Sequence, residues 1–196
     1  MADAAPEHKP VLWLARHGET EWSRDLRHTG RTDIPLTPAG EEQARALREP
    51  LAVVRFNRVL SSPLSRARET CELAGLGERA ELRDELMEWD YGDYEGITSA
   101  EIRERDPSWL LWRDGCPGGE SPAQVGARVD ALIAELLGAG GNVAVFAHGH
   151  LLRVLTARWI GLESAAGQLL ALSTATLSRL GWEHHCRVIE RWNAPA

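Results

Sequence analysis

The chain has 196 residues, a length that suits one domain with a sizeable core. It is 43% hydrophobic and 26% charged, as soluble globular proteins are. No apolar run reaches the roughly 18 residues that a membrane span requires, and the N-terminus lacks a secretory signal pattern. The formal net charge of −7 argues against nucleic acid as a partner. Three scattered cysteines fit a reducing compartment, so we expect a cytoplasmic protein.

The N-terminal region predicts a tail, a strand and a loop, in that order. Residues 1–9 are polar, and we expect them to form a flexible tail in front of one domain over residues 10–196. An apolar run at 11–15 predicts a buried strand. Residues 18–36 are rich in Gly, Thr, Asp and Pro, and this composition predicts a loop.

The first helix and the second strand have clear boundary signals. Thr37 and Pro38 are typical of an N-cap and a first helical residue, so a helix is predicted to start there. Residues 57–62 predict the second strand. A helix is expected to open at Pro63, with Ser62 as its cap.

The middle of the chain is irregular and then strongly helical. Residues 86–120 show only short helical pieces, near 98–105 and 107–113. A clear helix follows, because Ser121 and Gln124 form a capping-box pattern that leads into an apolar stripe. The stripe consists of Val125, Val129, Leu132, Ile133 and Leu136.

The C-terminal third predicts a strand at 142–147, a helix at about 150–160 and two closing strands at 175–183 and 185–192. Strands that alternate with helices, and that are apolar along their length, are typical of a parallel sheet covered on both sides. We therefore predict an α/β fold: one domain with a mostly parallel central sheet and helices on both faces.

Cationic and imidazole side chains follow three of the predicted strands. Arg16 and His17 end the first, Arg66 follows the second, and His148 ends the third. The carboxyl ends of parallel strands meet at one edge, where ligands bind in such sheets. Two arginines and two histidines in one crevice suit a phosphate dianion. Glycine at 18 and 149 would allow close backbone approach, and the helix after 149 would direct its positive end toward the anion.

A metal site is the alternative use of these residues. His148 and His150 are two residues apart, and so are Glu88 and Asp90. The H-E-x-x-H pattern is absent, however, and a metal cation beside two arginines would be unfavourable. We therefore expect no metal and no cofactor.

Five segments, in order, resemble the histidine phosphatase superfamily, which includes cofactor-dependent phosphoglycerate mutases and many phosphatases. The resemblance covers residues 11 to 192. It is carried by "RHGETEWS", "TGRTDIPLTPAGEEQA", "SSPLSRARET", "EWDYGDYEG" and "AHGHLLR". A single three-letter match would be weak, but five matches at workable spacing are specific.

The resemblance implies a role for each matching residue. His17 would be the nucleophile that takes the phosphoryl group, and Glu88 would be the general acid and base. The remaining phosphate-pocket residues would be Arg16, Arg66 and His148. Substrate contacts are expected from Ser23, Thr29, Gly30, Tyr91 and Gly149. Trp89 and Tyr91 are candidates for an apolar wall that would favour protonated Glu88.

Several departures from the mutase pattern favour a phosphatase. Trp89 follows the acid where mutases usually have Arg, Ser23 stands where they usually have Asn, and His150 replaces another common Asn. Only 31 residues separate Glu88 from Glu120, so the usual mutase insertion is missing. We predict a metal-independent phosphoric monoester hydrolase whose phosphohistidine is open to water.

The motifs are most similar to a subgroup of actinobacterial broad acid phosphatases and fungal sedoheptulose-bisphosphatases, which implies a sugar phosphate or a similar small phosphomonoester. Arg103 and Arg113 are either contacts for a distal anionic group or solvated helix charges. The segment 86–120 is expected to roof the pocket. Three alternatives stay open: a phosphoglycerate mutase, a protein phosphohistidine or phosphotyrosine phosphatase, and a non-catalytic binder of phosphorylated ligands. A homodimer is also left open.

Overall fold

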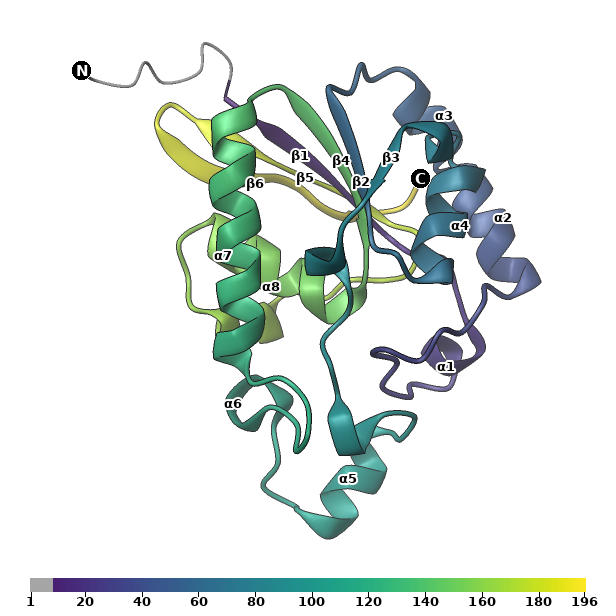
Figure 1. Ribbon diagram of the computed structural model, residues 1–196, viewed down its shortest axis with the longest axis vertical. Coiled ribbons are helices and arrows are strands. Elements are labelled where there is room, and N and C mark those ends of the chain that lie inside the picture. Colours follow the sequence, from purple (N-terminus) through teal and green to yellow (C-terminus); the bar gives the residue numbers. More distant parts are fainter. Residues whose placement is uncertain (1–8) are drawn as a thin grey trace.

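The computed structural model describes residues 9–196, and its centre is a six-stranded sheet with the order β3-β2-β4-β1-β5-β6 (Figure 1). Strands β1 to β4 run parallel to their neighbours in the group, while β5 and β6 extend the sheet in antiparallel fashion from β1. The prediction of a mostly parallel sheet is confirmed. The strands are β1 (Val11–Arg16), β2 (Arg58–Ser61), β3 (Ala80–Leu82), β4 (Asn142–Ala147), β5 (Leu177–Glu183) and β6 (Cys186–Ala194).

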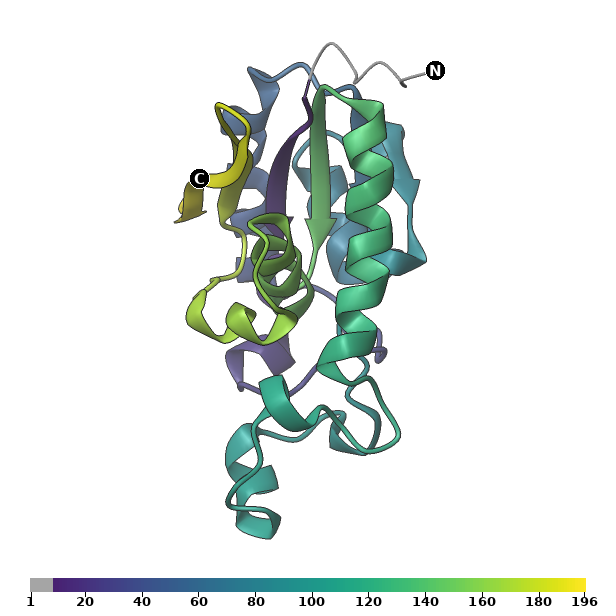
Figure 2. The same cartoon turned by 90° about the vertical axis from the view of Figure 1, so that its left-hand side faces the viewer.

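Helices cover both faces of the sheet, as expected. One face packs on α2 (Pro38–Ala46), α3 (Arg48–Ala52) and α4 (Ser65–Leu73), and the other on α7 (Pro122–Ala139) and α8 (Gly149–Trp159) (Figures 1 and 2). Two core clusters result, one on each face, because successive strand residues point to opposite sides. Leu14 belongs to the cluster under α7 and α8, and its neighbour Ala15 belongs to the other.

The carboxyl ends of the parallel strands face a separate layer of short elements. This layer holds α5 (Ser99–Arg105) and α6 (Leu111–Asp114) at the lower end of the molecule in Figure 1, and α1 (Glu21–Arg24) beside them. Short 3-10 helices occur at Gly77–Arg79, Asp84–Leu86, Gly92–Tyr94 and Ser164–Leu169. None of the helices in the part of the chain that the structure describes is long and apolar enough to cross a membrane.

The strongest helix predictions are confirmed. Thr37 accepts a hydrogen bond from the Gly40 N–H and caps α2, and Ser121 and Gln124 form the expected capping box of α7. Every residue of the predicted apolar stripe on α7 is buried. The pair His184 and His185 lies at the turn between β5 and β6, on the surface.

Other boundaries differ from the prediction. The expected loop at 18–36 contains α1, and β3 was not predicted; both elements are too short to show a period. The helix expected at 107–113 begins only at Leu111, because Asp106 turns the chain by accepting two hydrogen bonds from Ser108. Of the expected tail, residues 1–8 lie outside the described residues, and Lys9 donates a hydrogen bond to the His184 carbonyl (2.7 Å).

The predicted cap of α4 is wrong. The helix starts at Ser65, and its N-cap residue Leu64 provides no side-chain hydrogen bond. The Ser62 hydroxyl lies 2.8 Å from Nε2 of His148 instead. A residue expected to stabilise a helix end is therefore part of the site at the sheet edge.

Candidate active site

Strands β2, β4 and β1 lie side by side, so the residues that follow their carboxyl ends meet at one point. Arg16 is the last residue of β1, Ser62 follows β2, and His148 follows β4. The rings of His17 and His148 lie 5.2 Å apart, measured between centroids. The structure thus brings together residues that are more than 130 positions apart in the sequence.

His17 is buried and has a defined tautomer. Its Nδ1 lies 2.7 Å from the Gly18 carbonyl, which only accepts, so Nδ1 carries the proton and Nε2 keeps its lone pair. Burial and the nearby charges of Arg66 and Arg16 hold the pKa of His17 well below its usual value. The imidazole is therefore neutral at physiological pH, which is the form that can attack phosphorus.

His148, the second histidine of the site, is hydrogen-bonded to the arginine of α4. Its Nδ1 accepts a hydrogen bond from Nε of Arg66 (3.2 Å), and its Nε2 lies 2.8 Å from the Ser62 hydroxyl. Burial, followed by the charge of Arg66, keeps the pKa of His148 well below its usual value. The ring is neutral, so Nε2 is the protonated nitrogen and donates to Ser62.

Arg66 is fully buried and forms no ion pair with a carboxylate among the described residues, although Glu88, Asp33 and Glu95 are near enough to act on its charge. Its guanidinium donates to the backbone carbonyls of Thr32 (3.0 Å), Thr29 (3.1 Å) and Gly30 (2.9 Å). Burial lowers its pKa. The carbonyl groups fix the orientation of the cation, and the nearby carboxylates compensate its charge only from beyond ion-pair distance, so a bound anion would be stabilised here.

Arg16 has a donor that no protein group satisfies. Its Nη1 donates to the Leu172 carbonyl, but its Nε is buried and has no hydrogen-bond partner in the described structure. Gly149 lies against the guanidinium, since an added Cβ would come within 3.3 Å of Arg16 Nε. An orphaned cationic donor beside a glycine is a place where a ligand oxygen can bind.

Glu88 is buried and accepts three backbone hydrogen bonds. Oε1 accepts from the N–H groups of Trp89 (2.9 Å) and Leu151 (2.8 Å), and Oε2 accepts from that of His150 (3.0 Å). Two of these donors belong to the first turn of α8, so the positive end of this helix is directed at Glu88.

The surroundings of Glu88 also differ from the apolar wall that the sequence suggested. Backbone N–H donors contact both carboxylate oxygens, while the indole N–H of Trp89 bonds to the Glu120 carbonyl (2.9 Å). Arg128 of α7 holds the backbone that carries Glu88, because it donates to the carbonyls of Met87 (2.9 Å) and Glu88 (3.2 Å). The acid is thus held by backbone contacts on two sides.

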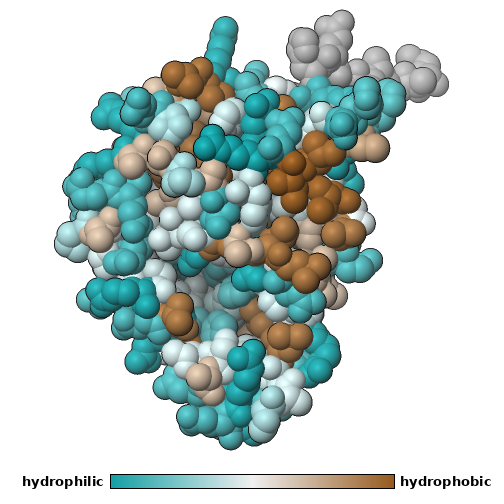
Figure 3. Space-filling view, turned by 180° about the vertical axis from the view of Figure 1, so that it is seen from behind, coloured by the Kyte–Doolittle hydropathy of each residue, from teal (hydrophilic) through white to brown (hydrophobic). Residues whose placement is uncertain are grey.

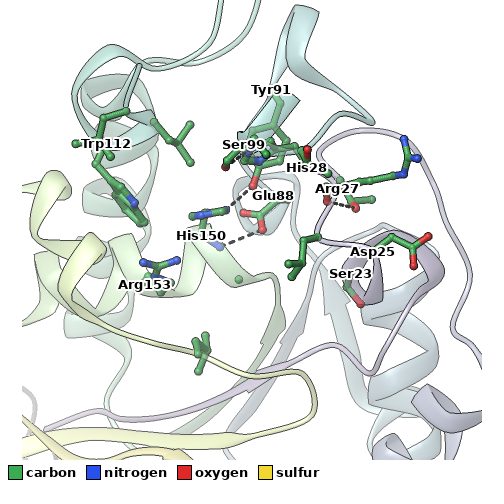
Figure 4. Close-up of a pocket in the computed structure, with 18 of the residues that line it drawn as sticks. Ser23, Asp25, Arg27, His28, Glu88, Tyr91, Ser99, Trp112, His150 and Arg153 are labelled. Carbon is green, nitrogen blue, oxygen red and sulfur yellow. Dashed lines mark hydrogen bonds between the residues drawn. The ribbon is translucent and has the colours of Figure 1, made fainter. Parts of the chain in front are cut away.

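These groups border a cavity of about 550 Å³ between the sheet edge and the 86–120 segment (Figure 4). The space-filling view from behind is hollowed above the lower end of the molecule, with hydrophobic residues on both sides of the hollow (Figure 3). Residues of the 86–120 segment line the cavity at Tyr91, Thr98–Ala100, Arg103 and Trp109–Trp112. The segment therefore encloses the cavity opposite the sheet, as a roof.

Most of the residues expected at the site line this cavity. The lining includes Arg16, His17, Glu88, Ser23, Thr29, Tyr91 and Gly149. Arg66 and His148 are not among the lining residues; they form a hydrogen-bonded pair, and the His148 ring lies next to that of His17. Gly30 is outside the lining; its carbonyl holds Arg66, and an added Cβ would approach the Trp89 carbonyl to 2.6 Å. Gly18 likewise packs closely on Gly40 of α2 rather than facing the cavity.

Three further candidate contacts differ in their placement, namely Ser23, Arg103 and Arg113. The Ser23 hydroxyl accepts from the Thr20 N–H and donates to the Thr20 carbonyl, as part of the capping box of α1. Arg103 lines the cavity, whereas Arg113 pairs with Asp114 on the surface and does not. Arg103 therefore stays a candidate contact for a ligand, whereas Arg113 is a solvated helix charge, the other reading that the sequence left open.

Sequence reasoning missed three cavity residues. His28 lines the cavity, as does Arg153, whose guanidinium lies over the Trp112 ring at 4.5 Å. His150 was noted only for its spacing from His148 and as a departure from the mutase pattern. His150 and Arg153 are three apart on α8, a helical spacing that places both on the face next to Gly149 and could have indicated them.

The described residues contain no group of three or more His, Cys, Asp and Glu placed to hold a metal ion. The strongest local cluster is cationic instead, with Arg16 and Arg66 beside the two histidines. The absence of a metal and of a cofactor stays a prediction.

A family model of the histidine phosphatase superfamily, branch 1, matches residues 12–195. The chain belongs to the histidine phosphatase superfamily. The resemblance inferred from the five motifs is confirmed, and the match includes both the sheet and the roof segment. Within this superfamily the chain has relatives of more than one activity.

Among the curated superfamily members, an acid phosphatase of Mycobacterium tuberculosis is 43% identical over 180 residues, covering 90% of this chain and 88% of the relative. A sedoheptulose 1,7-bisphosphatase of Saccharomyces cerevisiae is 39% identical, with coverage of 80% and 70%. A probable phosphoglycerate mutase of Salmonella is 29% identical. A solved Mycobacterium tuberculosis structure has a TM-score of 0.90 at 40% identity, covering 96% of this chain and 98% of that one.

Proposed function

We propose that this protein hydrolyses small phosphomonoesters, without a metal, through a phosphohistidine on His17. The observation that carries the proposal is the environment of His17: a neutral imidazole with a free Nε2, next to the buried Arg66 and to Arg16, whose buried Nε has no partner, and neither arginine forms an ion pair with a carboxylate among the described residues. A phosphate dianion supplies the missing negative charge. The superfamily membership and the two phosphatase relatives support the same activity.

In the first step, Nε2 of His17 attacks phosphorus, and the bond between phosphorus and the leaving oxygen breaks. Arg16 and Arg66 stabilise charge on the equatorial oxygens of the transition state, where phosphoryl transfer needs it most. His148 completes the pocket from the side of Arg66. The Gly18 carbonyl accepts a hydrogen bond from the Nδ1–H of His17, and this bond stabilises the cationic ring that forms.

Glu88 is the proposed general acid and base. Its Oε2 accepts only one protein hydrogen bond and retains a lone pair for a proton. Protonated Glu88 donates to the leaving oxygen. It then takes a proton from the water that attacks phosphohistidine, which releases inorganic phosphate and restores His17.

Hydrolysis is favoured over mutase activity by the short roof. Only 31 residues separate Glu88 from Glu120, and the cavity they border is large enough to admit water together with a small substrate. The yeast relative is a sedoheptulose 1,7-bisphosphatase, so we propose a sugar phosphate or a similar ester as the substrate of this protein. Ser23, Thr29 and Tyr91, which line the cavity, are proposed substrate contacts.

We also propose a cytoplasmic location. All three cysteines are free, and Cys71 and Cys116 are buried where burial raises the pKa of each thiol to about 12. Free thiols fit a reducing compartment. Fractionation of the source cells, followed by detection of the protein in the soluble cytoplasmic fraction, tests this proposal.

A phosphate-release screen tests the proposed function. The panel contains sugar phosphates, phosphoglycerates and phosphopeptides, each with and without a chelator, for the wild type and His17→Ala. We expect release from small esters, no effect of the chelator, and loss of at least about 10³-fold in kcat for His17→Ala. Strong inhibition by the chelator would contradict the mechanism, and isomerised phosphoglycerate without free phosphate would favour the mutase.

A further inference from the structure

One wall of the cavity is built from buried but uncharged polar rings. His28, Tyr91 and His150 cluster there, with ring centroids 4.6 Å apart for His28 and Tyr91 and 6.2 Å for the two histidines. Burial lowers the pKa of His28 to about 4, lowers that of His150 well below its usual value and raises that of Tyr91 well above it. All three side chains are neutral at physiological pH, unlike the arginine-rich phosphate site.

The hydrogen bond between Tyr91 and His150 fixes the tautomer of His150. The Tyr91 hydroxyl lies 2.6 Å from Nδ1 of His150. A neutral hydroxyl has one proton to donate, and no other acceptor for it occurs among the described residues. Nδ1 of His150 therefore accepts, and the ring proton is on Nε2.

Nε2–H of His150 is left as a donor for a ligand. No hydrogen-bond partner for this atom occurs in residues 9–196, and it is not among their fully buried unsatisfied atoms, while the residue lines the cavity. In Figure 4 the ring stands between Trp112 on one side and Glu88 and Tyr91 on the other. The ring is thus a rigid neutral donor that faces open space.

The position of His150 relative to Glu88 indicates which part of a ligand it meets. The backbone N–H of the same residue donates to Glu88 Oε2 (3.0 Å), so His150 adjoins the proposed general acid, and both residues line the same cavity. An acceptor there belongs to the organic part of the substrate, next to the ester bond. A neutral donor recognises a hydroxyl or carbonyl oxygen without preferring an anion.

We propose that His150 is a specificity-determining residue that binds an oxygen on the leaving group, and that Tyr91 is its positioning residue. The proposal rests on the proposed phosphatase function. It assigns to the site a substrate class, phosphate esters of polyols with an oxygen near the ester bond, in preference to esters without one. Loss of one such neutral hydrogen bond corresponds to roughly a tenfold change.

Two substrates distinguish this proposal from the function on which it rests. Glycerol phosphate carries hydroxyl groups near the ester bond, and phenyl phosphate carries none. For His150→Phe, which keeps an aromatic ring without a donor, we expect roughly tenfold lower kcat/KM on glycerol phosphate and a change under about twofold on phenyl phosphate. Tyr91→Phe removes the hydroxyl that orients His150, so it should lower kcat/KM on glycerol phosphate, and on that substrate the double variant should lose no more than His150→Phe alone. His185→Phe, on the exposed hairpin, is the matched control.

The tautomer provides a readout that does not depend on activity. Nitrogen-15 NMR of labelled protein should show His150 as the Nε2–H form in the wild type and as a tautomer mixture in Tyr91→Phe. Equal losses on both substrates, no loss on either, or an Nδ1–H tautomer in the wild type would overturn the proposal. If the wild type released no phosphate from either substrate, the proposed function itself would fail, while the NMR result would still decide the tautomer.

Discussion

Arg66 shows how a single residue prepares this site for an anion. The side chain is fully buried, four of its five N–H donors reach three backbone carbonyls and His148, and it forms no ion pair with a carboxylate among the described residues. The backbone carbonyls fix the orientation of the guanidinium, so the binding of phosphate does not require this group to rearrange. A buried charge that awaits a partner makes ligand binding and folding stability mutually dependent.

Inorganic phosphate is therefore predicted to stabilise the wild type against heat through Arg66. At a phosphate concentration about 100 times Kd, the gain in unfolding free energy is about 2.7 kcal/mol. Arg66→Met should show no phosphate-dependent rise in Tm, and its kcat/KM should fall by about 10²-fold to 10³-fold. The Tm of each protein is measured by thermal shift while phosphate is added to a sulfate-free buffer. An equal rise in Tm for the two proteins would contradict this role of Arg66.

Glu88→Gln is predicted to lower kcat according to the leaving group. General acid catalysis contributes about 10² to 10⁴-fold when the leaving oxygen is basic, as in an alkyl ester. A nitrophenolate leaves without a proton, so the loss on nitrophenyl phosphate should be much smaller. Kinetics on both substrates check this, and an identical loss would indicate that Glu88 does not protonate the leaving oxygen.

At the residue scale, the sequence predicted which side chains gather at the ends of the strands, and it missed much of the cavity wall. Arg16, His17 and His148 were visible because they stand at strand ends within motifs. His28 and Arg153 were not, since each lies in a segment whose pattern indicates only a loop or a helix face. Their contribution depends on how α5, α6 and α8 pack together, which no local pattern specifies.

At the element scale, α1 carries an unusual C-terminus. Arg27 N–H bonds to the Trp22 carbonyl (2.9 Å) and Leu26 N–H to the Ser23 carbonyl (3.4 Å), the arrangement of a Schellman motif. The left-handed position, usually a glycine, is Leu26 with φ 58° and 79% exposure, and this side chain lines the cavity. Strain and exposure both oppose stability at this position.

Leu26→Gly should therefore stabilise the protein by about 1 kcal/mol, because glycine adopts the left-handed region without the Cβ penalty. Urea unfolding of the wild type and the variant measures the difference. Leu162→Gly, at a position where no such φ occurs, is the comparison and should not stabilise. A less stable Leu26→Gly would show that the leucine side chain contributes more through contacts than it costs in strain.

The longer elements were predicted from the sequence and the short ones were not. The helix α7 has a capping box and a continuous apolar stripe, so its start and buried face were both correct. Strand β3 has three residues and α1 has four, too few for a period to appear. The start of α4 was misplaced because Ser62, a good cap by type, bonds to a histidine that lies 86 positions away.

At the scale of the whole molecule, three buried histidines and the partly buried His150 link stability to pH. The pKa values of His17, His28, His148 and His150 are all lowered, chiefly by burial, and that of His28 is about 4. Between the unfolded value of about 6.5 and the lower folded values, the unfolded chain binds more protons than the folded one. The stabilisation is therefore fully present above pH 6.5 and is lost as the pH falls toward 4.

We predict that the free energy of unfolding decreases on acidification through this window, by a few kcal/mol for His28 alone. His28→Gln, which cannot titrate, should show a shallower decrease than the wild type. His184→Gln, on the exposed turn, should leave the slope unchanged. Urea unfolding at several pH values between 7 and 4 checks all three proteins, and parallel curves for His28→Gln and the wild type would contradict the assignment.

The covalent intermediate on His17 is the central claim, and its direct observation is the most decisive measurement. Rapid quenching of the enzyme during turnover of a small phosphomonoester, under alkaline conditions that preserve phosphohistidine, allows peptide mass spectrometry of the site. We predict one phosphoryl group on the peptide that contains His17, at the nitrogen that the Gly18 carbonyl leaves free, and none in His17→Ala. Phosphate on another residue, or undiminished turnover by His17→Ala, would contradict the account.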